Sequence, residues 1–127
     1  MLKRIHHVAI ICSDYGRSKD FYVHTLGLKV VREIYRRERN SWKLDLMVGN
    51  EYQIELFSFP NPPKRPTRPE ACGPRHLAFA VDNVEQTAED LVRKGVAVEP
   101  IRVDETTGKK FTFFQDPDGL PIEIYEA

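Results

Sequence analysis

Residues 6–12 read His-His-Val-Ala-Ile-Ile-Cys, and residues 75–81 read Arg-His-Leu-Ala-Phe-Ala-Val. Aligning His7 with His76 also matches the small and apolar residues that follow each histidine. In both stretches large apolar side chains recur at every second position, as they do in a β-strand with one buried face. The pattern therefore indicates that one structural unit occurs twice in the chain.

Each of these strands leads into residues that predict a helix and then three more strands. The first helix is expected to begin at Ser13-Asp14 and to end near Gly27, and the second to begin at Asp82-Asn83 and to end near Gly95. The strands expected after them cover residues 28–35, 42–48 and 52–59 in the first copy, and 96–103, 109–115 and 120–125 in the second. The sequence thus predicts an α+β fold of two βαβββ modules.

A proline-rich segment separates the two copies. Five prolines within residues 60–69 exclude a helix or a central strand there. We expect one domain over residues 1–127, with modules at about 5–59 and 75–127 and an ordered linker at 60–74. The length of 127 residues suits one domain with a core of its own.

Charge and composition restrict the partners. Nineteen basic and nineteen acidic residues give a formal net charge of zero, which argues against nucleic acid as the main partner. No apolar run approaches the ~20 residues of a membrane span, and the N-terminus lacks a signal-peptide core. We therefore expect a cytoplasmic protein, without a membrane partner, in which Cys12 and Cys72 are free thiols.

Four side chains stand opposite the large apolar residues of their strands. Glu55 lies between Ile54 and Leu56, and Glu123 lies between two isoleucines in the same way. Alternation places both glutamates, with His7 and His76, on faces that the helices do not cover. Glu55 follows His7 by 48 residues and Glu123 follows His76 by 47, so the pair is duplicated with the module.

A divalent cation explains this set. A carboxylate on a partly buried face needs a partner, and two neighbouring carboxylates repel each other. Imidazole and carboxylate together suit Zn, Ni, Fe, Mn or Co. The alternative is that each residue has an ordinary structural or solvated role. That alternative is preferred for His6, which has Arg75 as its counterpart and is expected to face the helix, and for His24.

These residues give the chain a resemblance to the vicinal oxygen chelate superfamily, in particular to glyoxalase I-like proteins. The resemblance covers nearly the whole chain and is carried by residues 5–10, 21–28, 54–57, 75–79 and 114–123, the last of which contains Asp-Pro-Asp-Gly followed by Ile-Glu. It implies that the two modules form a cupped eight-stranded mixed sheet around a metal. It also matches His7, Glu55, His76 and Glu123 one for one with the family's metal ligands.

The resemblance further implies an activity. Four ligands resemble glyoxalase I (lactoylglutathione lyase), with Zn or Ni favoured, Glu123 as the base that moves a proton and Glu55 as ligand or second base. The reaction would be isomerisation of a small oxygen-chelating substrate, such as a glutathione hemithioacetal of an α-ketoaldehyde. Alternatives are another enzyme of the same superfamily, a dioxygenase or a thiol transferase, and a non-catalytic metal-containing binding protein.

Substrate residues and assembly are less constrained. Candidates for the substrate pocket are Trp42, Lys43, Lys110 and Phe111, with Arg36, Arg37 or Arg68 available for an anionic substrate. A small-molecule substrate and a homodimer are expected, because in this superfamily the two modules of a site come from one chain or from two.

Overall fold

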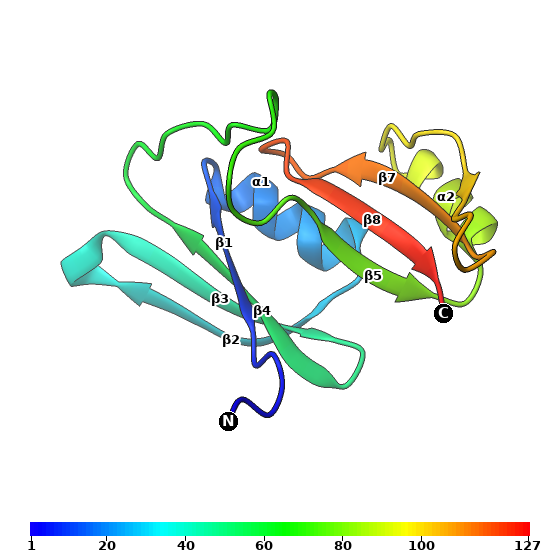
Figure 1. Ribbon diagram of the computed structural model, residues 1–127. Coiled ribbons are helices and arrows are strands. Elements are labelled where there is room, and N and C mark those ends of the chain that lie inside the picture. The colour runs from blue at the N-terminus through cyan, green and yellow to red at the C-terminus, as the bar shows by residue number, and fades with distance from the viewer. The chain divides into compact units, whose positions relative to one another are not determined.

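The computed structural model describes residues 1–127 and divides into two compact units, residues 1–64 and 65–127. Each unit contains one four-stranded sheet and one main helix (Figure 1). The division between Lys64 and Arg65 falls inside the proline-rich segment. The predicted fold class, two βαβββ repeats with mixed sheets, is confirmed.

Unit 1 contains β1 (Val8–Cys12), α1 (Tyr15–Asp20), β2 (Lys29–Arg36), β3 (Ser41–Val48) and β4 (Glu51–Ser58). A π-helical stretch, η1 (Phe21–Thr25), continues α1, and a 3₁₀ turn, η2 (Arg37–Arg39), joins β2 to β3. The strand order is β1-β4-β3-β2, with β1 parallel to β4 and the other pairs antiparallel. One helix between two parallel strands is the expected crossover of such a unit.

The helix of unit 1 begins where the sequence predicts. Asp14 is its N-cap and accepts a hydrogen bond from the backbone N–H of Arg17 at 3.1 Å. Its residues Ser18 and Tyr22 are fully buried. The buried strand residues of the unit are Leu44 and Leu46 of β3, Ile54 and Leu56 of β4, and Ile10 and Cys12 of β1. These side chains form one apolar face, which leaves the other face of the sheet for chemistry.

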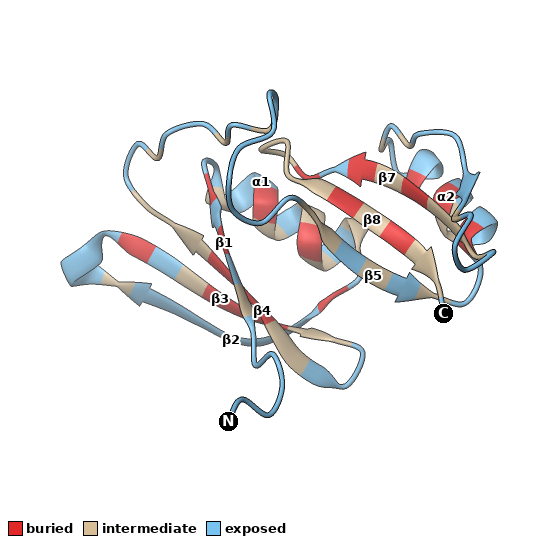
Figure 2. Cartoon of the chain, viewed as in Figure 1, coloured by how far each residue is buried: buried red, intermediate tan, exposed pale blue.

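Unit 2 contains β5 (Leu77–Val81), α2 (Val84–Arg93), β6 (Arg102–Val103), β7 (Lys110–Gln115) and β8 (Pro121–Glu126). Its strand order, β5-β8-β7-β6, repeats that of unit 1. Asn83 is the N-cap of α2 and accepts from the backbone N–H of Gln86 at 2.9 Å. The buried residues of α2 (Val84, Ala88 and Leu91) and those of β7 and β8 belong to the core of unit 2 and are shown in red in Figure 2.

One predicted strand is much shorter than expected. Residues 96–103 were expected to form a strand, but β6 covers only Arg102–Val103. Pro100 has no N–H to donate to a ladder. The preceding segment is instead held by Glu99 N–H, which donates to Phe113 C=O at 2.9 Å, and by the Thr112 hydroxyl, which donates to Glu99 C=O at 2.7 Å.

Two further expectations concern the chain as a whole. Cys12 is buried and Cys72 is exposed, and neither forms a disulfide bond, as predicted. None of the helices has the length and apolar composition that crossing a bilayer requires.

Candidate metal-binding site

The face of each sheet opposite its buried residues carries the predicted ligands. In β1, Ile10 and Cys12 are buried whereas Ala9 and Ile11 are exposed, as two-residue alternation requires. Ala9 is the register partner of Glu55 on β4. Unit 2 repeats the arrangement, with Ala78 as the register partner of Glu123. A small side chain therefore stands beside each glutamate.

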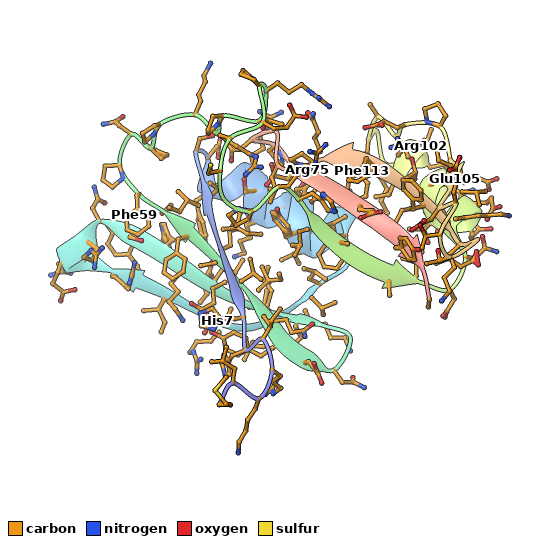
Figure 3. The ribbon with its side chains drawn as sticks, viewed as in Figure 1. His7, Phe59, Arg75, Arg102, Glu105 and Phe113 are labelled. Atoms are coloured by element: carbon orange, nitrogen blue, oxygen red, sulfur yellow. The ribbon has the colours of Figure 1, made fainter.

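Unit 1 brings its two predicted ligands together. His7, labelled in Figure 3, lies one residue before β1, and its Nε2 is 3.4 Å from Glu55 Oε2. The Nδ1 of His7 is 2.9 Å from the Nδ1 of His6, so one ring donates and the other accepts. When His7 donates, its Nε2 lone pair points toward the carboxylate. A hydrogen bond from the ring nitrogen that does not face the metal commonly orients a metal-binding histidine.

Glu55 is tightly held. It is 7% exposed, and it accepts a hydrogen bond from the Tyr52 hydroxyl. Lys43 Nζ lies 3.7 Å from Glu55 Oε1 and 2.7 Å from Asp45 Oδ1. Burial, with hydrogen bonds to the Glu55 and Asp45 carboxylates, raises the pKa of Tyr52, so this residue stays a neutral donor. The carboxylate of Glu55 is therefore fixed in place by its neighbours.

Asp45 completes this network. Burial alone would raise the pKa of the Asp45 carboxyl, but hydrogen bonds from Lys43, Arg32 and Tyr52 outweigh it and hold the pKa below its usual value. Arg32 Nη2 is 2.8 Å from Asp45 Oδ2. The side chain of Asp45 is thus an anion that keeps Lys43 next to Glu55.

Unit 2 repeats the pair in different surroundings. His76 Nε2 is 3.0 Å from Glu123 Oε2, and this is the polar side-chain contact that the structure gives Glu123. The position opposite Glu123 in the β7–β8 ladder belongs to Phe113, where unit 1 has Asp45. The Phe113 ring meets the His76 ring edge-on at 5.0 Å, and His76 Nδ1 is buried without a hydrogen-bond partner. Glu123 is consequently held less firmly than Glu55.

These donors fit a divalent metal. In each unit an imidazole Nε2 faces a carboxylate oxygen, so either Nε2–H donates to the carboxylate or a cation lies between the two atoms. Imidazole and carboxylate suit Zn, Ni, Fe, Mn and Co. Neither unit alone gathers three or more His, Cys, Asp or Glu side chains as a group. Each unit by itself therefore offers one histidine–glutamate pair as candidate ligands.

The predicted substrate residues divide between the two faces of their sheets. Lys43 contacts Glu55, and Phe111 lies on the same face of β7 as Phe113, lining a surface hollow with Glu123. Trp42 is stacked on Tyr15 of α1, with ring centroids 5.3 Å apart, and so lies on the helix-covered side. Lys110 likewise pairs with Glu85 of α2. The structure thus separates Trp42 and Lys110 from the faces that carry the glutamates.

The arginines suggested for an anionic substrate also differ. Arg36 lies over the Phe57 ring at 4.8 Å and donates to Ser41 Oγ at 3.1 Å, whereas Arg37 belongs to the turn η2. Arg68 lines a cavity of unit 2.

Sequence reasoning missed three contributors to this site. His6 was expected to face the helix, but it is exposed and contacts His7. Tyr52 and Asp45 were not considered, although both hold the Glu55 side of the site. The doublet His6-His7 was a usable signal for the first, whereas the other two depend on the register of β3 and β4.

The comparison with known proteins agrees with this fold. A model of the Glyoxalase/Bleomycin resistance protein/Dioxygenase superfamily matches residues 4–124. The chain belongs to this superfamily. The superfamily's members generally bind a divalent metal, consistent with the donors described above.

Three relatives resemble this chain over nearly its whole length. The uncharacterized protein YwkD of Bacillus subtilis is 61% identical over 126 residues, which are 99% of this chain and 98% of YwkD. The crystal structure of a glyoxalase family protein from Enterococcus faecalis is 52% identical, with a TM-score of 0.89 over 98% of each chain. A lactoylglutathione lyase of Escherichia coli O157:H7 is 32% identical over 97% of this chain and 92% of its own length.

Proposed function

We propose that the protein is a metal-dependent isomerase or lyase of glyoxalase I type. One divalent metal, Zn or Ni in preference to Fe, Mn or Co, is held by His7, Glu55, His76 and Glu123. The substrate is a small molecule with neighbouring oxygens, such as the hemithioacetal of glutathione and an α-ketoaldehyde. Relatives that are lactoylglutathione lyases, at about 30% identity, support this choice.

The proposal rests mainly on one observation. The repeat relates His7 and Glu55 to His76 and Glu123, and in both units the imidazole Nε2 faces a carboxylate oxygen, at 3.4 Å and 3.0 Å. The contact recurs at repeat-related positions beside Ala9 and Ala78, which argues against two unrelated structural roles. A duplicated donor pair supports a shared cation.

The two glutamates have different roles. Glu55, bound by Tyr52 and Lys43, keeps one orientation and serves as a permanent ligand. Glu123 contacts His76 and stands opposite the apolar Phe113, so its carboxylate is free to turn toward a substrate carbon and accept a proton there. The metal, when bound, supplies Lewis-acid polarisation of the substrate oxygens.

The two donor pairs of one site can belong to one chain or to two chains. We propose a homodimer in which each site combines one unit-1 pair with one unit-2 pair. Native mass measured with and without metal tests this part. A monomer that binds one metal tightly would show that a single chain completes the site.

The experiment uses apo protein reloaded with Zn, Ni, Co, Mn or Fe in turn. Metal content is measured by elemental analysis, and turnover is measured with the hemithioacetal of glutathione and methylglyoxal. We expect one metal per chain, and turnover with Ni or Zn. His7→Ala and His76→Ala should each lose metal, because each removes one of four ligands.

The glutamate variants distinguish a role in metal binding from a role in catalysis. Glu55→Gln should mainly weaken metal binding, whereas Glu123→Gln at saturating metal should lower kcat by about a hundredfold or more, the usual contribution of a general base. His24→Ala, on an exposed helix position, is the matched histidine control. If the reloaded protein binds metal but turns over no hemithioacetal with any of the metals, the isomerase function is rejected and the superfamily's other activities are favoured. Absence of bound metal would reject the whole proposal.

A further inference from the structure

Unit 2 contains a cavity of about 220 Å³ beside His76. One wall is formed by residues 65–75, and another by Phe113, Phe114 and Gln115 of β7 with Pro121 of β8. Pockets for drug-sized ligands span roughly 300–1,000 Å³. This cavity therefore suits a small molecule or one end of a larger one.

The wall formed by residues 65–75 is fixed by hydrogen bonds. Arg65 donates to Pro74 C=O at 3.1 Å and to Arg75 C=O at 2.9 Å, and it also donates to Thr67 Oγ1 at 3.0 Å. The Thr67 hydroxyl in turn donates to Gly119 C=O at 3.1 Å, in the turn before β8. Arg65 is thus a structural residue, and the cavity has a preformed shape.

The cavity lining carries excess positive charge. Arg65, Arg68, Arg75 and Arg102 face two glutamates, so the lining has a formal charge of +2 with His76 neutral. Glu70 Oε2 lies 3.8 Å from Arg68 Nη1 and 3.5 Å from Arg75 Nη2. Glu99 Oε1 lies 3.4 Å from Arg102 Nη2. These ion pairs are long and exposed, and such pairs contribute little stability. A ligand anion can therefore replace Glu70 or Glu99 as the arginine's partner at small cost.

An aromatic residue connects this charge to the candidate metal ligands. The Arg102 guanidinium lies over the rings of Phe111 and Phe113, 5.0 and 5.6 Å from their centroids. Phe113 touches His76 edge-on and is the register partner of Glu123. Arg75, Phe113 and Arg102 follow one another across unit 2 in Figure 3. A molecule whose anionic group meets the arginines would lay its body on Phe113, toward His76 and Glu123.

We propose that this cavity is an anion subsite that binds the carboxylate or phosphate group of a small substrate through Arg75 and Arg102. The proposal deepens the proposed function, because it names the substrate class of the same site. Guanidinium groups suit both anions, since they offer paired N–H donors in a plane. The subsite itself needs no metal, so the two proposals can fail separately.

The test is titration of metal-free protein with inorganic phosphate and with succinate, followed by NMR of backbone amides and arginine Nε–H groups. Metal is removed by a chelator that is then washed out completely, because a chelator is itself a polyanion. The uncharged analogue succinamide is the ligand control. We expect saturable binding of at least one anion, with shifts at residues 65–75 and 99–103, and no binding of succinamide.

Two variants test the arginines. Arg75→Gln and Arg102→Gln should each weaken anion binding about tenfold, the scale of one charge-assisted hydrogen bond. Arg93→Gln, which removes an exposed arginine paired with Asp90 on α2, is the matched control and should leave affinity unchanged. Preference for phosphate or for succinate assigns the ligand's anionic group.

Either of two results would overturn the subsite: no saturable binding of either anion, or affinities unaltered in both arginine variants. Because the titration uses apo protein, such a failure would leave the metal-dependent activity standing. Conversely, if the protein binds the anion but takes up no metal, the anion subsite is supported and the metal-dependent function is rejected.

Discussion

Asp45 lies directly opposite Glu55 in the β3–β4 ladder, and both carboxylates are almost fully buried. Two buried anions at neighbouring positions would repel each other strongly. Lys43 contacts both, and Arg32 contacts Asp45, so the two cations balance the two anions. The charges on the face of unit 1 that carries Glu55 are therefore balanced without a metal, and the proposed metal would be a further partner for Glu55.

Lys43→Met should destabilise the protein, because it leaves two buried carboxylates with only Arg32 to balance them. We expect the free energy of unfolding of metal-free protein to fall by about 2 to 3 kcal/mol. Urea unfolding measures this difference. Lys110→Met is the matched control: Lys110 pairs with the exposed Glu85, so its loss should cost under about 1 kcal/mol. Equal costs for the two variants would contradict the role given to Lys43.

Tyr52→Phe should weaken metal binding while preserving the fold. The Tyr52 hydroxyl fixes the Glu55 carboxylate, and loss of a hydrogen bond that orients a metal ligand typically costs about ten- to a hundredfold in metal affinity. Competition with a coloured chelator gives the affinity. Tyr35→Phe is the control, since its hydroxyl meets Asn40 at 2.5 Å on the exposed strand β2. Wild-type affinity in Tyr52→Phe would show that Glu55 needs no such support.

Glu33 should give a pH-dependent contribution to stability. Hydrogen bonds from Lys19 and Tyr15 lower the pKa of its carboxyl below the usual value of 4.5. A lowered folded-state pKa stabilises the protein fully above the unfolded-state value, and this stabilisation disappears as pH falls through the folded-state value.

The measurement compares wild type with Glu33→Gln in urea across pH. Wild type should be more stable by about 1 kcal/mol near neutral pH, and the difference should shrink below pH 4.5. Glu89→Gln, at an exposed position of α2, should show no such trend. A difference that grows on acidification would have the wrong sign for this ion pair.

Thr112→Val should loosen the segment before β6. The buried Thr112 hydroxyl donates to Glu99 C=O at 2.7 Å and lies 3.3 Å from Pro100 C=O. Its loss should cost about 1 to 2 kcal/mol and speed amide exchange in residues 99–103. Hydrogen-exchange mass spectrometry checks this, with the exposed Thr106→Val as control. Unchanged exchange in that segment would mean that the Glu99–Phe113 backbone bond holds it alone.

Much of this architecture could be predicted from sequence because a strand has a two-residue period. Ile54 and Leu56 are buried on one face, so Glu55 had to occupy the other. The repeated histidines then identified the same face in β1 and β5. The pairing of each histidine with its glutamate followed from the parallel neighbours β1–β4 and β5–β8.

The remainder depended on register between antiparallel strands. Trp42 and Lys110 were expected in the substrate pocket, yet both face a helix, because Lys43 and Phe111 occupy the alternate positions of their strands. The β3–β4 register shifts between Leu46 and Met47, and a single-residue shift of that kind leaves no clear mark in the sequence. The sequence alone therefore could not show that Asp45 lies opposite Glu55.

The outer strands β2 and β6, which end the two sheets on the side away from the parallel pairs, differ fourfold in length, eight residues against two. A long outer strand offers backbone N–H and C=O groups to any passing chain, and this invites aggregation. In β2 the irregularity between Val30 and Arg32 breaks the flat edge, and charged Lys29, Arg32, Glu33 and Arg36 interrupt its apolar residues. Replacing those charges with apolar residues would allow β2 to pair with strands of other chains and aggregate, whereas β6 is too short for such pairing.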